Sequence, residues 1–316
     1  MTNSDLIRSR DEAKEIAARG DHQRAVDILT KLLPDFEKHM GVEHLETLRL
    51  RDQIGLWTGD AGDPRKAVSL LRELLAERNR ICGPEHPDTL YTKGSLAYFI
   101  GESGSYADGA RLRKEVLLAE QRVLGPTHPQ VFVTRNGVAA LIGHAGDPAQ
   151  AVALLGALLR EREERFGPTD SGTLRTRHEL ARWTGVNGDA ETARTSLAKL
   201  LPIRSETLGE EHPHTLTTRH ELARWTGEAG APAEAESMLR ELLPVRERIQ
   251  GPTHPRTLAT RYELARWAGA NGNSAEAREM LADLLRLRHA VLGAEHPHTV
   301  ATERLLARQS AVTGRS

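Results

Sequence analysis

The chain has 316 residues and a nearly balanced charge, with 43 Lys and Arg against 44 Asp and Glu, which argues against a general binder of nucleic acids or other polyanions. Aromatic residues make up only 4% of the chain and there is one cysteine, so neither a sheet-rich fold nor a disulfide framework is expected. The N-terminal segment lacks the apolar core of a secretory signal, and the longest apolar run, residues 151–159, is about half of what spans a bilayer. We therefore expect a cytoplasmic protein without a membrane segment.

A period of 42 residues runs through the chain. Glycines recur at this spacing, and three residues after most of them comes a His-Pro pair such as His86-Pro87. A fixed period of this length is the sequence signature of a solenoid, in which each unit packs only against its neighbours. The glycines are Gly41, Gly83, Gly125, Gly167, Gly209, Gly251 and Gly293.

Each 42-residue unit is predicted to consist of two helices joined by a tight turn. Pro suits the first turn of a helix, and the preceding His, or Asp170 in one repeat, suits the cap. A second glycine column, with Gly62 as an example, marks the end of the first helix. Apolar residues then follow at spacings of three and four, as in Leu70, Leu71 and Leu74, which predicts the second helix.

In chain order, we predict seven helix pairs and a closing helix within a single domain, residues 1–316. The first pair is degenerate, since its first helix, roughly Asp5 to Arg19, carries Glu12 where later repeats are apolar. The end of the chain repeats the first-helix pattern once more, at about residues 296–312, and is predicted to be a capping helix. The pairs span about residues 4–40, 44–82, 86–124, 128–166, 170–208, 212–250 and 254–292.

The columns L-A-x-W-x-G-x-x-G-D, seen from Leu180 to Asp189, resemble a tetratricopeptide repeat. The HP-x-T-L start and the 42-residue period are similar to the longer variety found in kinesin light chains and in many bacterial proteins. The resemblance covers essentially the whole chain and implies an all-α, right-handed superhelical solenoid. It also implies that the first helices of the pairs line a concave groove that binds extended peptides or helices. A HEAT-like array is the alternative, because its period overlaps 42 residues.

Three columns of the first helices, one helical turn apart, are predicted to face this groove. The resembled family carries a pair of Asn before Leu-Ala that contacts peptide backbones, and here only Asn136 matches. The columns are apolar or small in the N-terminal half, with two tyrosines, and rich in Arg and His from His178 onward. The predicted groove residues are Arg175, His178, Arg182, His220, Arg224, Tyr262, Arg266, Arg308, Asn136, Tyr91 and Tyr98.

The Arg and His ladder suits an acidic peptide segment, a free carboxylate or phosphate groups, since Arg binds such groups bidentately. Glu179, Glu221 and Glu263 precede three of the arginines by three residues, so ion pairs along the helix surface are the other interpretation. The Trp column has the spacing of core residues, and we expect it to pack between helices. A second basic column is expected to be structural, comprising Arg51, Lys93, Arg135, Arg177, Arg219 and Arg261.

No catalytic, cofactor or metal site is predicted. HELAR, which begins at His178 and again at His220, lacks the second His of the zinc-binding HExxH motif. The notable residues recur from repeat to repeat, whereas a catalytic residue is usually singular. We therefore predict a scaffold or adaptor that binds a protein or peptide. The alternatives are a ligand-gated sensor of a small peptide or acidic metabolite and, less favoured, an accessory protein or enzyme of a biosynthetic pathway.

Overall fold

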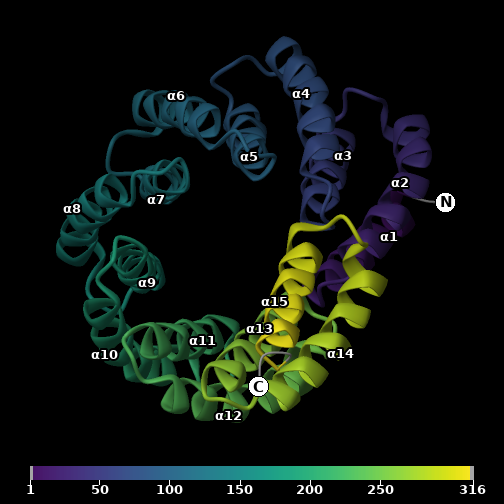
Figure 1. Ribbon diagram of the computed structural model, residues 1–316. Helices are drawn as coiled ribbons and strands as arrows, with labels where there is room; N and C mark the ends of the chain where they lie inside the picture. Colours follow the sequence, from purple (N-terminus) through teal and green to yellow (C-terminus); the bar gives the residue numbers. More distant parts are fainter. Residues whose placement is uncertain (1–2, 314–316) are drawn as a thin grey trace. The chain divides into compact units, whose positions relative to one another are not determined.

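The computed structural model describes residues 3–313, and the side chains of residues 5–310. Within this range the chain forms fifteen helices and no strand, which confirms the predicted all-α solenoid of seven pairs and a closing helix. The chain divides into two compact units, Met1–Arg160 (unit 1) and Glu161–Ser316 (unit 2) (Figure 1). The boundary falls inside a helix, and no linker in the sequence marks it; the single domain of the sequence analysis stays a prediction.

The helices match the predicted repeats closely, and the first and second helices of each pair have 16 and 18 or 19 residues. In unit 1 they are α1 Asn3–Ala18, α2 His22–Met40, α3 Leu45–Asp60, α4 Pro64–Ile81, α5 Pro87–Glu102, α6 Tyr106–Leu124, α7 Pro129–His144 and α8 Pro148–Phe166, which runs into unit 2. In unit 2 they are α9 Ser171–Val186, α10 Ala190–Leu208, α11 Pro213–Glu228, α12 Pro232–Gln250, α13 Pro255–Ala270, α14 Ser274–Leu292 and α15 Pro297–Thr313.

The predicted caps are present at the helix starts. Nδ1 of His86, for example, accepts a hydrogen bond of 3.2 Å from the backbone N–H of Asp88, and Asp170 accepts one of 2.9 Å from Thr173. The loop glycines adopt φ values between 85° and 106°, a region that other residues rarely enter. The same histidine cap occurs at His44, His128, His212, His254 and His296.

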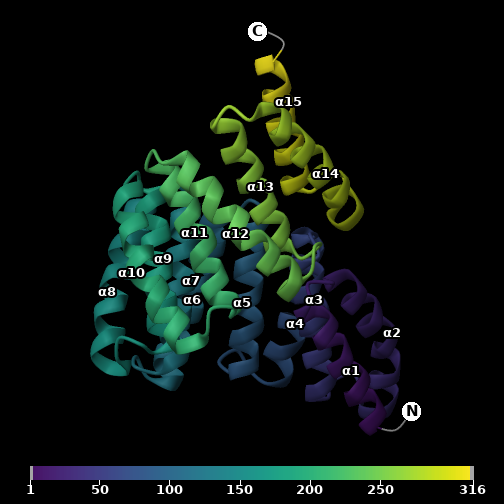
Figure 2. The same cartoon turned by 90° about the horizontal axis from the view of Figure 1, so that it is seen from below.

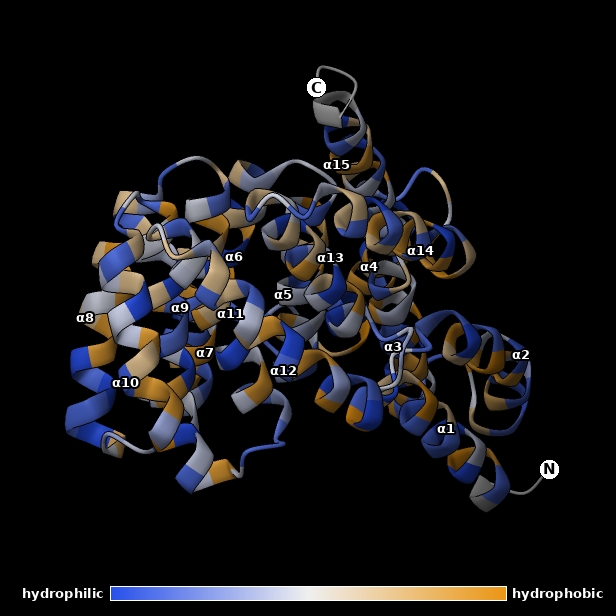
Figure 3. Ribbon diagram, turned by 60° about the horizontal axis from the view of Figure 1, so that its bottom comes forward, coloured by the Kyte–Doolittle hydropathy of each residue, from blue (hydrophilic) through white to orange (hydrophobic). Residues whose placement is uncertain are grey.

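The odd-numbered helices of each unit form one layer, which we call its inner layer. Contacts join α3 to α5 and α5 to α7 in unit 1, and α9 to α11, α11 to α13 and α13 to α15 in unit 2. Each of α2, α4, α6, α10, α12 and α14 packs against the odd-numbered helices before and after it. Figure 1 shows α5 and α7 on the inner side of the curve of unit 1, with α6 outside them. Figure 2 shows α9 to α12 side by side in unit 2. Hydrophobic and hydrophilic residues alternate along these helices (Figure 3), as expected of amphipathic helices that bury one face.

The Trp column holds consecutive inner helices together, as predicted. Trp225 is only 4% exposed, and its indole lies over Gly185 of the preceding repeat, where an added Cβ would come within 2.6 Å of the ring. Trp267 lies over Gly227 in the same way, at 2.4 Å. The Gly two residues after each Trp is therefore required because the next repeat's bulky residue occupies its space.

A second column that stabilises the stack was not anticipated from the sequence. Near the end of the second helix, the buried guanidinium of Arg204 donates hydrogen bonds to Leu174 O on α9 and to His214 O on α11, both at 3.0 Å. It also donates to Thr218 Oγ1 at 2.6 Å, so one side chain joins three helices. Burial lowers the pKa of Arg204 to about 10. Equivalent buried arginines are Arg78, Arg162, Arg246 and Arg288.

Replacing Arg204 tests this role. Arg204→Met keeps most of the apolar stem but removes three hydrogen bonds, so we expect unit 2 to lose about 1–3 kcal/mol of unfolding free energy. Urea denaturation followed by Trp fluorescence measures the change. Arg194→Met, which removes a partly exposed arginine of the same helix, is the matched control and should change little. Equal stability of the two variants would contradict a stapling role for Arg204.

Candidate functional site

The predicted arginine ladder lies on the inner layer of unit 2, and each of its first three arginines has an acidic partner. Each guanidinium also lies over the indole of the Trp that follows it, with 4.4–5.0 Å to the ring centroid. These arginines keep about a third of their side-chain surface exposed. The helix-surface pairing that the sequence left open is therefore present. The pairs are Arg182–Glu179, Arg224–Glu221 and Arg266–Glu263, at 3.5, 3.8 and 3.2 Å.

The two histidines of the ladder carry no positive charge at neutral pH. His178 is 5% exposed, and burial, followed by the charges of Arg204 and Arg182, lowers its pKa to about 3. His220 has a pKa of about 3 for the same main reason, and its Nδ1 lies 3.2 Å from Thr260 Oγ1. These side chains can therefore offer a ligand hydrogen bonds but no charge, in contrast to the charged ladder that the sequence suggested.

A group of basic side chains without an acidic partner lies beside the ladder; we call Arg175, Arg204, His214 and Arg256 the basic cluster. Arg204 donates to His214 O at 3.0 Å and Arg256 to Pro213 O at 3.5 Å, so both guanidinium groups reach the start of α11. Partial burial, and then the charges of Arg204, His212, Arg256 and Arg175, lower the pKa of His214. Arg256 donates a 2.7 Å hydrogen bond to Thr217 Oγ1, and Nε of Arg175 is buried without a partner. Among the described residues, none of the three arginines forms an ion pair with a carboxylate.

The remaining predicted groove residues are distributed over both units. Tyr262 lies under the guanidinium of Arg288, 5.2 Å from its centroid, and Arg308 is exposed on α15. In unit 1, Asn136 is buried, at 7% exposure, and its Nδ2 donates to Phe132 O at 3.2 Å. This places the single Asn that matches the family motif against its own helix. Tyr91 and Tyr98 are 54% and 47% exposed on α5.

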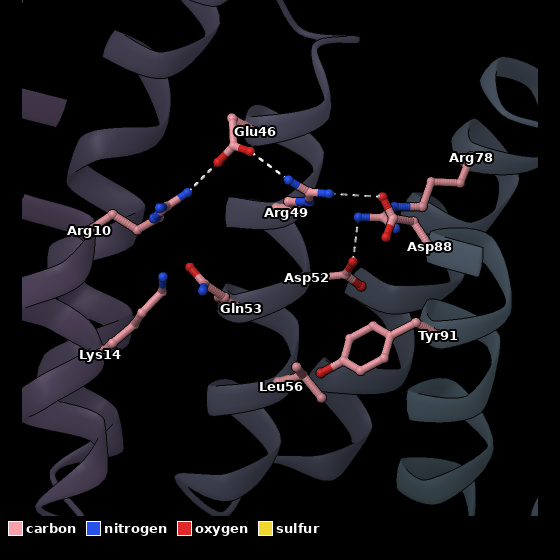
Figure 4. A pocket seen from close by; sticks show the side chains of 10 residues that line it. All are labelled: Arg10, Lys14, Glu46, Arg49, Asp52, Gln53, Leu56, Arg78, Asp88 and Tyr91. Carbon is pink, nitrogen blue, oxygen red and sulfur yellow. Dashed lines mark hydrogen bonds and ion pairs between the residues drawn. The ribbon is translucent and has the colours of Figure 1, made fainter. Parts of the chain in front are cut away.

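A cavity of about 400 Å³ opens between α1, α3 and α5 of unit 1 (Figure 4). Its upper wall is a chain of ion pairs, in which Arg10 contacts Glu46, Glu46 contacts Arg49 at 2.7 Å, and Arg49 lies 3.7 Å from Asp88. The part of the cavity below these ion pairs is the second region of its lining (Figure 4). This lower region is lined by Lys14, Gln53, Leu56 and Tyr91.

The deepest acid of the cavity is Asp52, which is 4% exposed. Its carboxylate pairs with Arg78 at 2.5 Å and accepts a 2.9 Å hydrogen bond from Thr92. Burial nevertheless outweighs these contacts and raises the pKa of Asp52 to about 6.

The apolar or small N-terminal surface expected from the sequence is thus incomplete. Glu46 and Asp88, the second residues of α3 and α5, reach the inner layer, and so does Arg78 from α4. These residues lie outside the three columns of the first helices that were predicted to face the groove. The column formed by the second residue of each first helix could have been identified from the sequence. It changes from the acidic Glu46 and Asp88 to the basic His214 and Arg256 along the chain.

The other structural predictions can be compared directly. Trp183 is 2% exposed, which confirms its core role. In the described part of the chain no group of three or more His, Cys, Asp or Glu could hold a metal ion, and no helix there could span a membrane. The second basic column is paired as predicted at Arg51–Glu77, Lys93–Glu115, Arg177–Glu163 and Arg261–Glu247.

The buried, neutral His178 makes unit 2 sensitive to acid. The unfolded chain binds a proton at this residue below about pH 6.5 and the folded chain does not until about pH 3. Its contribution to stability is therefore present above pH 6.5 and is lost as the pH falls, by about 1.4 kcal/mol per pH unit. Urea unfolding followed by Trp fluorescence should show a shallower loss on acidification for His178→Asn than for wild type. His289→Asn, at an exposed site of the same unit, should keep the wild-type slope; equal slopes for all three would contradict the assignment.

Comparison with known proteins gives a consistent result. A tetratricopeptide repeat profile matches residues 173–248 and 228–290, and a second one matches residues 47–88, together about half of the chain. A putative kinesin light chain from Podospora anserina with nearly identical TPR-like repeats is 28% identical, with a TM-score of 0.53 over 65% of this chain and 97% of that one.

Two further solved structures share the fold at low sequence identity. A Rap protein in complex with Competence and Sporulation Factor is 9% identical, with a TM-score of 0.57 over 99% of both chains. NprR in complex with its cognate peptide NprX is 14% identical, with a TM-score of 0.58 over 95% of this chain and 84% of that one. No curated protein matches the chain.

Proposed function

Because the chain belongs to the tetratricopeptide repeat family, we propose that it is a non-catalytic scaffold that binds another protein or peptide. We further propose that the inner layer of unit 2 is the binding surface and that it prefers an acidic segment or a free carboxylate.

The observation that carries this preference is the basic cluster. Arg204 and Arg256 both reach the start of α11, and neither they nor Arg175 have a carboxylate within ion-pair distance in the described structure. Burial lowers the pKa of Arg175, followed by repulsion from Arg162. A bound carboxylate would offset both effects, because charge-assisted hydrogen bonds to a guanidinium are short and can be bidentate.

In this proposal the ladder arginines contribute less to the binding free energy than the basic cluster does. Arg182 lies about two turns beyond Arg175 on α9 and extends the basic surface, but it already contacts Glu179. An acidic ligand must compete with that glutamate, and a partly exposed ion pair of this kind contributes little to either state. The indoles under the ladder remain core residues in this proposal.

A second candidate is a regulator whose state changes when a peptide binds. It is favoured by the fold neighbours, since one is a Rap protein complexed with a sporulation factor and another is NprR, described as a quorum sensor. Both candidates share the peptide-binding surface, and we place both in the cytoplasm of a bacterium. A small-angle scattering profile that changes on addition of a bound acidic peptide would favour the regulator.

The preference for acid can be tested with two peptide pools of equal length, one rich in Glu and one with Gln in place of Glu. Wild-type protein should bind the Glu pool about tenfold or more tightly, and raising the salt should weaken this binding. The double variant Arg175→Gln, Arg256→Gln should lose most of the preference. Fluorescence anisotropy measures all the affinities.

The matched control removes two arginines from the second helices of the same unit, Arg194→Gln and Arg240→Gln, both in ion pairs with glutamates. It changes the net charge equally and should keep the preference. Two results would contradict the proposal: equal binding of both pools by wild type, or equal losses in the two double variants, which would indicate only a general charge effect.

A further inference from the structure

One position in the second helices departs from the repeat in a single unit. Six of the seven residues in this column are leucines with no exposed surface, and the seventh, in α6, is Arg113. A charged residue at a core position is costly unless the fold provides for it. The leucines are Leu29, Leu71, Leu155, Leu197, Leu239 and Leu281.

Two glycines of the inner layer leave the space that the Arg113 side chain occupies. Gly94 on α5 stands in the column of Asp52 and His178, and Gly137 on α7 stands in the column of Gln53 and Glu179. A Cβ added to Gly94 would lie 2.3 Å from Arg113 Nη1, and one added to Gly137 would lie 3.2 Å from its Nε.

α6 packs against both α5 and α7, so the Arg113 side chain reaches between them from the outer layer. The guanidinium therefore occupies the space that two groove-side residues fill in other repeats. The three departures from the pattern are mutually dependent, because an alanine at Gly94 would already require the Arg113 side chain to move.

The guanidinium of Arg113 is not balanced by a close acid. Its Nε is buried without a hydrogen-bond partner, and in the described chain no carboxylate lies within ion-pair distance. Burial lowers its pKa, and the charges of Glu120 and then Tyr91 act in the opposite direction. Glu120 itself is 3% exposed and accepts a hydrogen bond from Gln130 at 3.3 Å.

Two exposed tyrosines share a helix face with Gly94, the residue that Arg113 Nη1 lies against. Tyr91 and Tyr98 lie three residues before and four residues after Gly94 on α5, which places all three on one face of the helix. About half of the surface of each tyrosine is accessible. Arg113 Nη1 lies against Gly94, about one helical turn along α5 from Tyr91. Burial and Asp52 raise the pKa of the Tyr91 phenol, and the charge of Arg113 acts in the opposite direction. This face of α5 thus carries two accessible phenols, and the Arg113 guanidinium lies against the glycine between them in the sequence.

We propose that Arg113, Tyr91 and Tyr98 form a binding site on the inner layer of unit 1 for a carboxylate attached to an aromatic or apolar group. The C-terminal residue of a peptide and a free aromatic acid both have this chemistry. The guanidinium binds the carboxylate, and the tyrosine rings cover the apolar group. This site uses no residue of the basic cluster in unit 2, so it stands independently of the proposed function.

The probes are N-acetyl-phenylalanine, its amide, and a Gly/Ser heptapeptide ending in Phe with a free or amidated C-terminus. Binding is measured by calorimetry and by NMR. Wild type is expected to bind the acid forms about tenfold or more tightly than the amides. If the free-acid peptide binds more tightly than N-acetyl-phenylalanine, the natural source is a peptide terminus; if the two bind equally, it is a small acid.

Arg113→Leu restores the residue found in the other six repeats, so it should fold at least as well as wild type while losing the preference for acids. Gly94→Ala should lose it as well, because its methyl displaces the guanidinium. Arg111→Leu, which removes an exposed arginine of the same helix, should retain the preference.

The site is refuted if wild type binds acid and amide equally or binds neither, or if Arg113→Leu keeps the preference. The double variant Arg175→Gln, Arg256→Gln should keep the acid preference of these probes. A failure in unit 2 is thereby distinguished from a failure in unit 1.

Discussion

The contact between successive inner helices is the constraint on which the rest of this structure depends. A bulky residue of one repeat lies on a glycine of the repeat before it, as Trp225 does on Gly185, and a buried guanidinium such as Arg204 joins three helices at the same junction. These contacts consume two columns of every unit. Most residues of the candidate sites come from other columns, whereas Arg204 belongs both to a junction and to the basic cluster.

Burial at these junctions also decides which basic residues are charged and available. His178 and His220 lie beside buried arginines and remain neutral, and the ladder arginines are held by glutamates one turn away on the same helix. The positive charge without a carboxylate partner comes instead from Arg175, Arg204 and Arg256 on α9, α10 and α13, whose charges act on His214 of α11. A binding surface built this way depends on the stacking of several repeats and cannot be assigned to one of them.

Departures from the repeat carry more functional information than the repeat itself. Arg113 interrupts a column of buried leucines, and Gly94 and Gly137 remove the two side chains that would collide with it. Arg113, Gly94 and Gly137 are therefore best explained together, because the two glycines leave room for the guanidinium of the arginine. The recurrence of notable residues argued only against catalysis, and Arg113 of α6 is a singular polar residue that the three groove columns of the first helices did not include.

The sequence alone determined the period, the helix boundaries, the histidine caps and the core role of the Trp column, because these depend on local spacing and on residues within one unit. Tertiary structure decided which charges are paired, which histidines are neutral and where Arg113 lies. Each of these depends on burial and on distances between residues from different helices. A column alignment shows that Arg113 is unusual, but only the packing of α6 against α5 and α7 shows that its charge takes the place of the missing side chains at Gly94 and Gly137.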